Sequence, residues 1–167
     1  MKLAKQIEKK LNDQVNFEIY SAYYYLGMAA WCEERNLNGA GHFFRLQAKE
    51  ELEHAMKFFD YILERGGSIA LEPISRPAAS YKSLRDVVSA ALKHEREVTS
   101  RIEEMMDSAR AKKDYATQNL LDWFVEEQVE EENSMEKILA RMDLAGDKGA
   151  GLLMIDKELG KRGRETS

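Results

Sequence analysis

The chain has 167 residues, a formal net charge of −5 and only two prolines, and 33% of its residues are charged. It has no run of about 18 apolar residues, so we expect no membrane span, and its negative charge argues against nucleic acid as a partner. Cys32 has no partner for a disulfide and the first residues lack the pattern of a secretory leader, so we expect a cytoplasmic protein. One domain over 1–167 is long enough to bury its own core.

Apolar residues recur at helical spacing from the start of the chain. They predict a first helix over about 5–35 and a second over about 39–65, which ends at two glycines. The short link between the two helices forces an antiparallel pair. Both prolines lie in about 66–82, where no helical period is present, so we expect a crossover that runs the length of a bundle.

The second half of the chain predicts three further helices. A Ser-x-x-Asp capping box begins a helix over about 83–111, an aspartate caps one over about 114–144, and glycines isolate a short fifth over about 150–160. Long helices with one apolar stripe bury it by packing side by side as a four-helix bundle. The expected class is therefore all-α.

A repeated spacing of polar residues is the most informative feature of the sequence. In each half a glutamate is followed 33 positions later by a glutamate or glutamine, and three positions after that by a histidine or glutamate. The members are Glu18, Glu51 and His54 in the first half, and Glu95, Gln128 and Glu131 in the second. Residues three apart on a helix point to one side, so each such pair is able to hold one ion.

Glu18 and Glu95 fall on or beside the expected apolar stripe. Their neighbours about one or two turns away are Val15, Ala22, Leu26, Val88, Leu92 and Thr99. Converging carboxylates in a core cost several kcal/mol per ion unless they are protonated or bind cations. The alternative is that each glutamate lies at the edge of the stripe and reaches solvent. The doubled spacing favours a metal site.

The donor types indicate which metal the site takes. Carboxylates, an imidazole and an amide are hard or borderline donors, which favour Mg²⁺, Mn²⁺ or iron over copper(I) or thiolate-bound zinc. Iron fits best, because glutamates stabilise Fe³⁺ over Fe²⁺ and so allow dioxygen to oxidise a ferrous pair.

Three segments carry a resemblance to a known family: LNDQVNFEIYSAYYYL, QAKEELEHAMKFFDYI and NLLDWFVEEQVEEE. They resemble prokaryotic non-haem ferritins, bacterial or archaeal, over nearly the whole chain. Glu51 and His54 match the Glu-x-x-His motif of ferritin-like di-iron proteins. Gln128 and Glu131 supply no second histidine, which departs from bacterioferritins. The resemblance implies a ferritin-like four-helix bundle with one long crossover and a short fifth C-terminal helix.

The resemblance also implies roles for the residues of the repeated set. Glu18, Glu51 and His54 match ligands of one iron, with Glu51 bridging to a second. Glu95 and Glu131 match the other ligands of that second iron, and Gln128 matches a hydrogen-bonding neighbour.

Four other residues have counterparts near the family's di-iron centre. Glu50, Glu127 and Glu130 match carboxylates that form a third iron site together with Glu131. A solvated acidic face is the alternative interpretation of these three residues. Tyr25 matches the tyrosine beside the di-iron centre.

Further residues are assigned no ligand role. Leu52 stands where a bacterioferritin carries its haem-binding methionine, so no haem is expected. We expect His42 and His94 at the surface, Trp123 in the core or the wall of the site, and Cys32 as a free small residue.

The leading functional hypothesis is a ferroxidase that stores iron. Fe²⁺ is oxidised by O₂ or H₂O₂ and kept as Fe³⁺ mineral inside a homo-oligomeric shell, of 24 subunits by resemblance. A peroxide reductase of rubrerythrin type is an alternative, but it predicts a Cys-x-x-Cys module that is missing from this sequence. A DNA-protecting mini-ferritin is disfavoured by the short fifth helix. A helical interaction module without metal is a further alternative, and stoichiometric binding of iron by the purified protein would distinguish the two.

Overall fold

The computed structural model describes residues 2–78 and 80–163. These residues form five helices and no strand, which confirms the predicted all-α class. The helices are α1 (Lys5–Glu33), α2 (Asn38–Glu64), α3 (Leu84–Ala111), α4 (Tyr115–Ala145) and α5 (Gly149–Leu159). No helix in this part of the chain combines the length and the apolar character that a bilayer-spanning segment needs.

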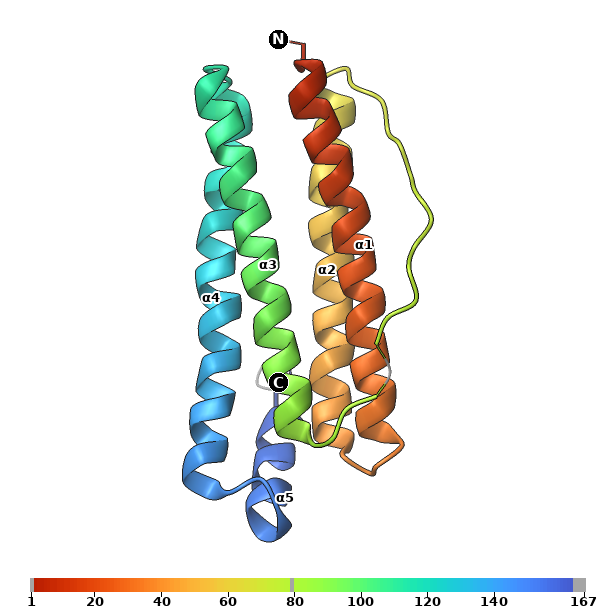
Figure 1. Cartoon of the computed structure of the whole chain (residues 1–167), viewed down its shortest axis with the longest axis vertical. Coiled ribbons are helices and arrows are strands. Elements are labelled where there is room, and N and C mark those ends of the chain that lie inside the picture. Colours follow the sequence, from red (N-terminus) through yellow and green to blue (C-terminus); the bar gives the residue numbers. More distant parts are fainter. Residues whose placement is uncertain (1, 79, 164–167) are drawn as a thin grey trace.

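The four long helices form two antiparallel hairpins, α1 with α2 and α3 with α4 (Figure 1). The crossover leaves the end of α2, runs beside α1 and reaches the start of α3 at the other end of the bundle (Figure 1). This path explains why about 66–82 is long and has no helical period. The observed architecture is the four-helix bundle with one long crossover that the sequence predicts.

Two asparagines of α1 hold the first part of the crossover. Asn12 Nδ2 donates to the Ser68 carbonyl at 2.9 Å, and Asn12 Oδ1 accepts from the Ala70 amide at 2.7 Å. One turn further on, Asn16 donates to the Ala70 carbonyl and accepts from the Glu72 amide, both at 2.8 Å. The side-chain amides supply the partners that this extended backbone lacks.

Capping side chains fix where α3 and α4 begin. Ser83 Oγ accepts from the Asp86 amide, and the Asp114 carboxylate accepts from the Thr117 amide, each at 3.1 Å. Asp114 also accepts two hydrogen bonds from Arg65, both at 3.1 Å. Because Arg65 follows α2, this forked ion pair joins the two hairpins at one end of the bundle.

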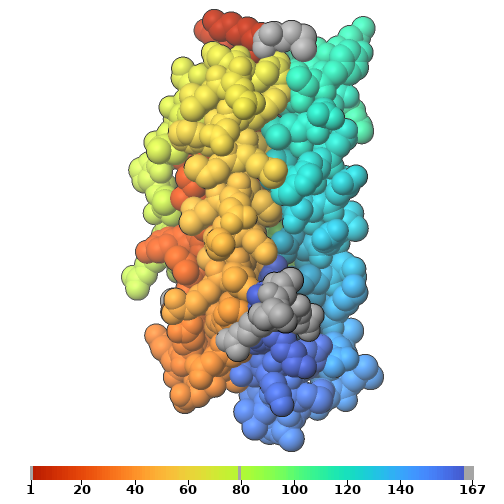
Figure 2. Space-filling view, turned by 180° about the vertical axis from the view of Figure 1, so that it is seen from behind, coloured from red at the N-terminus to blue at the C-terminus, as the bar shows by residue number. Residues whose placement is uncertain are grey.

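The short helix α5 packs against α2 and α4 at the end of the bundle where α2 begins (Figure 2). Asp156 Oδ1 accepts from the Ala40 amide at 2.8 Å. A Cβ atom at Gly39 would lie 1.8 Å from the Asp156 carbonyl oxygen, so the approach of α5 to α2 requires a glycine there.

The hydrophobic core is divided into two clusters along the bundle axis. One contains Tyr25, Phe44 and residues at the α5 end, and the other contains Phe58, Phe124 and residues at the opposite end. The acidic residues of the repeated set lie between the clusters.

One residue of the expected apolar stripe is placed differently. Leu26 was expected on the stripe, and this was wrong because its side chain is 46% exposed. The buried face of α1 passes through Ala22, Tyr25 and Ala29 instead.

Candidate metal centre

All six residues of the repeated set are buried in the gap between the two core clusters. One comes from α1, two from α2, one from α3 and two from α4: Glu18, Glu51, His54, Glu95, Gln128 and Glu131. Glu18 and Glu95 are 0% exposed, which decides between the two interpretations in favour of inward-pointing carboxylates. The bundle thus brings both halves of the repeat to one level.

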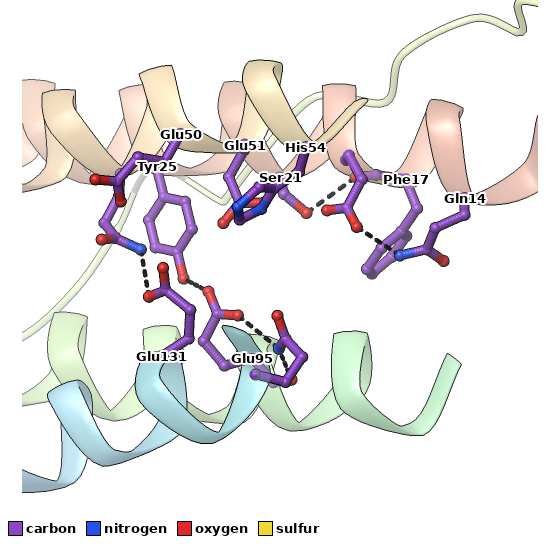
Figure 3. A network of polar contacts seen from close by, with 12 residues as sticks. Gln14, Phe17, Ser21, Tyr25, Glu50, Glu51, His54, Glu95 and Glu131 are labelled. Atoms are coloured by element: carbon purple, nitrogen blue, oxygen red, sulfur yellow. Dashed lines mark hydrogen bonds and ion pairs between the residues drawn. The ribbon is translucent and has the colours of Figure 1, made fainter. Parts of the chain in front are cut away.

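Glu18, Glu51 and His54 form a compact donor cluster. One ligand atom from each lies within 4.8 Å of the others. His54 Nδ1 is 3.3 Å from Glu51 Oε2, and Gln14 Nε2 donates to Glu18 Oε1 at 2.7 Å (Figure 3). Glu18 Oε2 and Glu51 Oε1 are buried and have no hydrogen-bond partner among the described residues. Because an unpaired buried oxygen is costly, this pair of oxygens fits a bound cation.

Glu95 and Glu131 line the other side of the same space. The Tyr25 hydroxyl donates to Glu95 Oε1, and Gln128 Nε2 donates to Glu95 Oε2 at 3.1 Å (Figure 3). Glu131 Oε2 accepts from Gln47 Nε2 at 2.9 Å. Tyrosine and amide donors therefore orient these carboxylates.

Burial changes the proton affinity of every carboxylate in the cluster. It raises the pKa of Glu18 well above its ordinary value, with a further increase from the nearby Glu51. It also raises the pKa of Glu51, to which Glu95 adds. The pKa values of Glu95 and Glu131 rise to about 7, in both cases mainly through burial. Without a cation the cluster favours its protonated forms, so a divalent ion competes with protons for these oxygens.

The three additional carboxylates lie on the solvent side of the cluster. Glu50, Glu127 and Glu130 line a groove of about 1060 Å³ together with Glu131, between α2, α4 and α5. Glu50 forms an ion pair with Arg162 at 2.6 Å. The structure thus places the predicted third set beside the buried one and opens it to solvent.

Trp123 lies in the wall of the site, which is one of the two positions that the sequence predicts. Its ring is edge-on to the His54 ring, with 5.6 Å between centroids, and 36% of it is exposed. The Lys57 amine lies 4.2 Å from the centre of the Trp123 ring. Cys32 is a buried free cysteine, as expected.

His94 was expected at the surface, and this was wrong. Its side chain is buried, its Nε2 lies 2.7 Å from Ser21 Oγ, and its ring stacks on Phe17 and Tyr24. Burial lowers the pKa of His94 to about 4, so the ring is neutral at physiological pH. His94 directly precedes Glu95 on α3, and the aromatic residues of α1 cover this face of the helix.

The other surface histidine of the prediction is only partly exposed. His42 is half-buried, and its Nε2 lies 2.9 Å from the Arg162 carbonyl oxygen. It is therefore a contact between α2 and the segment after α5, and it lies outside the donor cluster.

Two glutamines that orient the carboxylates were missed from the sequence. Gln14 lies one turn before Glu18, and Gln47 lies one turn before Glu51. They are 33 positions apart, which is the same spacing as the two glutamates that they precede. This repeated interval is the signal in the sequence that identifies them. Each glutamine lies four positions before its glutamate and so shares a helix face with it.

Comparisons with known proteins show which family the chain resembles along its length. The ferritin family, described as a ferritin-like domain, matches residues 8–145. A probable bacterial non-haem ferritin-like protein of Haemophilus influenzae is 41% identical over 158 residues, covering 95% of this chain and 96% of that protein. The bacterial non-haem ferritin of Escherichia coli O157:H7 is 40% identical over 157 residues, covering 94% and 95%. An open-pore ferritin from the archaeon Archaeoglobus fulgidus superposes with a TM-score of 0.94 at 42% identity, covering 96% and 99%. The chain belongs to the ferritin family.

Proposed function

We propose that this protein oxidises Fe²⁺ at an intrasubunit di-iron centre and stores the Fe³⁺ inside a shell built from copies of the chain. The family and the fold support iron storage with ferroxidase activity. The single observation that carries the proposal is the pair of buried, unpartnered oxygens, Glu18 Oε2 and Glu51 Oε1, beside His54. Buried carboxylate oxygens without hydrogen bonds are stable in a protein core when a bound cation neutralises their charge.

In this proposal Glu18, Glu51 and His54 bind the first Fe²⁺, and Glu51 also reaches the second. Glu95 and Glu131 bind the second ion, because they face the same space from the other hairpin. Gln128 donates to Glu95 and keeps one of its oxygens directed toward the centre. The resemblance extends this set with Glu50, Glu127 and Glu130 as a third site beside Glu131.

The charges of the centre favour oxidation of the bound iron. Fe²⁺ displaces protons from carboxylates whose pKa burial has raised, and the resulting anions stabilise Fe³⁺ more than Fe²⁺. With dioxygen, two Fe²⁺ each give up one electron, and O₂ takes up both electrons and two protons to give H₂O₂. With H₂O₂ as oxidant, the same two electrons and two protons give two water molecules.

Tyr25 has a positioning role that its contacts support. Its side chain is buried, and burial raises the pKa of its hydroxyl well above the ordinary value, so the group stays protonated. A protonated Tyr25 donates to Glu95 and leaves the second Glu95 oxygen for Gln128 and the iron. Electron donation by Tyr25 is a further role that the resemblance implies.

The shell of 24 subunits, its location in the cytoplasm and the absence of haem are also parts of the proposal. The superposition of 96% of this chain on an archaeal ferritin supports assembly into a shell. Leu52 is 48% exposed and supplies no haem ligand of the methionine type.

Aerobic addition of Fe²⁺ to the metal-free protein tests the proposed activity. The ferric absorbance in the near ultraviolet is followed at rising iron to subunit ratios. Fast oxidation should saturate at about two or three irons per subunit and be lost in a Glu51→Ala/His54→Ala variant. The matched control is Glu53→Ala, which removes an exposed carboxylate between these two positions. Oxidation at the buffer rate, or an unchanged rate in the double variant, refutes the proposal.

A further inference from the structure

The segment that follows α5 returns to α2. Asp156 of α5 accepts the Ala40 amide at 2.8 Å, which holds α5 at the start of α2. Past the end of α5, the Arg162 carbonyl oxygen lies 2.9 Å from His42 Nε2. These two contacts direct the Arg162 side chain along α2 into the acidic groove, which it helps to line.

The Arg162 side chain is held by three different contacts. Its guanidinium lies over the Phe43 ring, 4.6 Å from the centroid. Nη2 donates to Glu50 Oε2 at 2.6 Å, and Nη1 donates to Gln47 Oε1. Stacking fixes the plane of the guanidinium and the two hydrogen bonds fix its rotation within that plane. Arg162 is therefore built into this position.

One amide connects Arg162 to the proposed di-iron centre. Gln47 accepts from Arg162 through Oε1 and donates through Nε2 to Glu131 Oε2, at 2.9 Å. Glu131 is a proposed ligand of the second iron and also lines the groove. The position of Arg162 thus influences both a carboxylate of the groove, Glu50, and a carboxylate of the centre.

The groove contains several basic side chains, but their contacts differ. Its lining includes Lys137, Arg141, Lys157, Lys161 and Arg162. The glutamates of the centre and of the proposed third site that line the groove are Glu50, Glu127, Glu130 and Glu131. Among the described residues, Arg162 is the only one of the five basic residues that forms an ion pair with any of them. Arg141 pairs instead with Glu158, on α5.

We propose that Arg162 is a tethered cation that occupies the proposed third iron site and must leave Glu50 before a metal ion binds there. The inference rests on the proposed function and adds a control step to it. While Arg162 is in place, its positive charge balances the negative charge of Glu50, and Gln47 keeps Glu131 directed toward the di-iron centre. When Arg162 withdraws, Glu50 becomes a ligand and Glu131 is free to turn toward the third ion. Arg162 is therefore a positioning residue for the passage of iron from the centre to the store.

Titration of the assembled, metal-free protein with Zn²⁺ tests this role without redox chemistry. In Arg162→Gln, calorimetry should show the third Zn²⁺ per subunit bound about threefold to tenfold more tightly than in the wild type, while the first Zn²⁺, held by Glu18, Glu51 and His54, binds as before. The effect is modest because both partners of the ion pair are partly exposed, at 28% and 38%. Arg162→Lys, which keeps the cation, should restore most of the wild-type affinity.

Lys161→Gln is the matched control. Lys161 lines the same groove and its replacement removes the same charge, but its side chain forms no ion pair among the described residues. Its third Zn²⁺ should bind as in the wild type. An unchanged third affinity in Arg162→Gln, or equal tightening in Lys161→Gln, overturns the inference.

Crystals of the wild-type protein saturated with Zn²⁺ provide a test that depends on no variant. Glu50 should contact the third ion, and Arg162 should have moved away from it. A third ion bound with the Arg162 ion pair intact overturns the inference. Failure of the proposed function is distinguishable, because it removes the first two Zn²⁺ sites or the iron oxidation of the wild type, whereas failure of the inference leaves both intact.

Discussion

Replacing Glu131 with glutamine tests what a buried carboxylate does to the metal-free protein. In the folded chain, burial and the nearby Glu95 raise the pKa of Glu131 from its ordinary 4.5 to about 7. Between these values the folded state keeps a proton that the unfolded state has lost. The free energy of unfolding therefore falls as the pH rises from about 4.5 to about 7. Below pH 4.5 Glu131 is protonated in both states and does not lower the stability. The difference between the two pKa values corresponds to about 3 kcal/mol.

The assay is urea unfolding of metal-free protein at pH 4.5 and pH 8. Glutamine at position 131 can still accept from Gln47, so the variant removes the titration and keeps the hydrogen bond. The wild type should lose about 3 kcal/mol more than Glu131→Gln between the two pH values. Glu136→Gln, at a site whose side chain is 53% exposed, should behave as the wild type does. Equal losses in the wild type and Glu131→Gln refute the reasoning.

Three further predictions concern other parts of the bundle. Asn12→Ala removes two hydrogen bonds to the crossover, so the free energy of unfolding should fall by about 1–3 kcal/mol and amide exchange at Ala70 should accelerate; unchanged exchange contradicts the assigned role. Co²⁺ bound at the centre should quench the fluorescence of Trp123, because the Trp123 ring lies beside His54. Quenching should therefore persist in Trp31→Phe and disappear in Trp123→Phe. Burial raises the pKa of the Cys32 thiol to about 12, so iodoacetamide at pH 8 should alkylate it in urea but leave the native protein unmodified.

The parts of the structure that follow helical periodicity could be predicted from the sequence. Glu18 and Glu95 share a face with apolar neighbours, and this face is buried in the bundle. The crossover could be predicted as well, because this segment contains both prolines and its apolar residues do not recur at helical spacing. These features depend on residues within one or two helical turns of each other.

Features that depend on contacts between distant segments were harder to predict. His94 lacks any local signal of burial, and its environment consists of aromatic rings from α1. Leu26 lies four positions after the buried Ala22, yet it falls beyond the face of α1 that its neighbours cover, and its side chain is 46% exposed. The contact of Arg162 with Glu50 joins residues 112 positions apart. Such contacts depend on how the helices pack, which one helix's periodicity does not determine.

The most direct test of the metal centre is anomalous diffraction from crystals soaked in Fe²⁺ without oxygen. The proposal predicts one iron peak contacting Glu18, Glu51 and His54, and a second contacting Glu51, Glu95 and Glu131. Data collected on either side of the iron absorption edge distinguish iron from other ions. Iron found only on exposed carboxylates, with the buried cluster empty, contradicts the proposal that these residues form a ferroxidase centre.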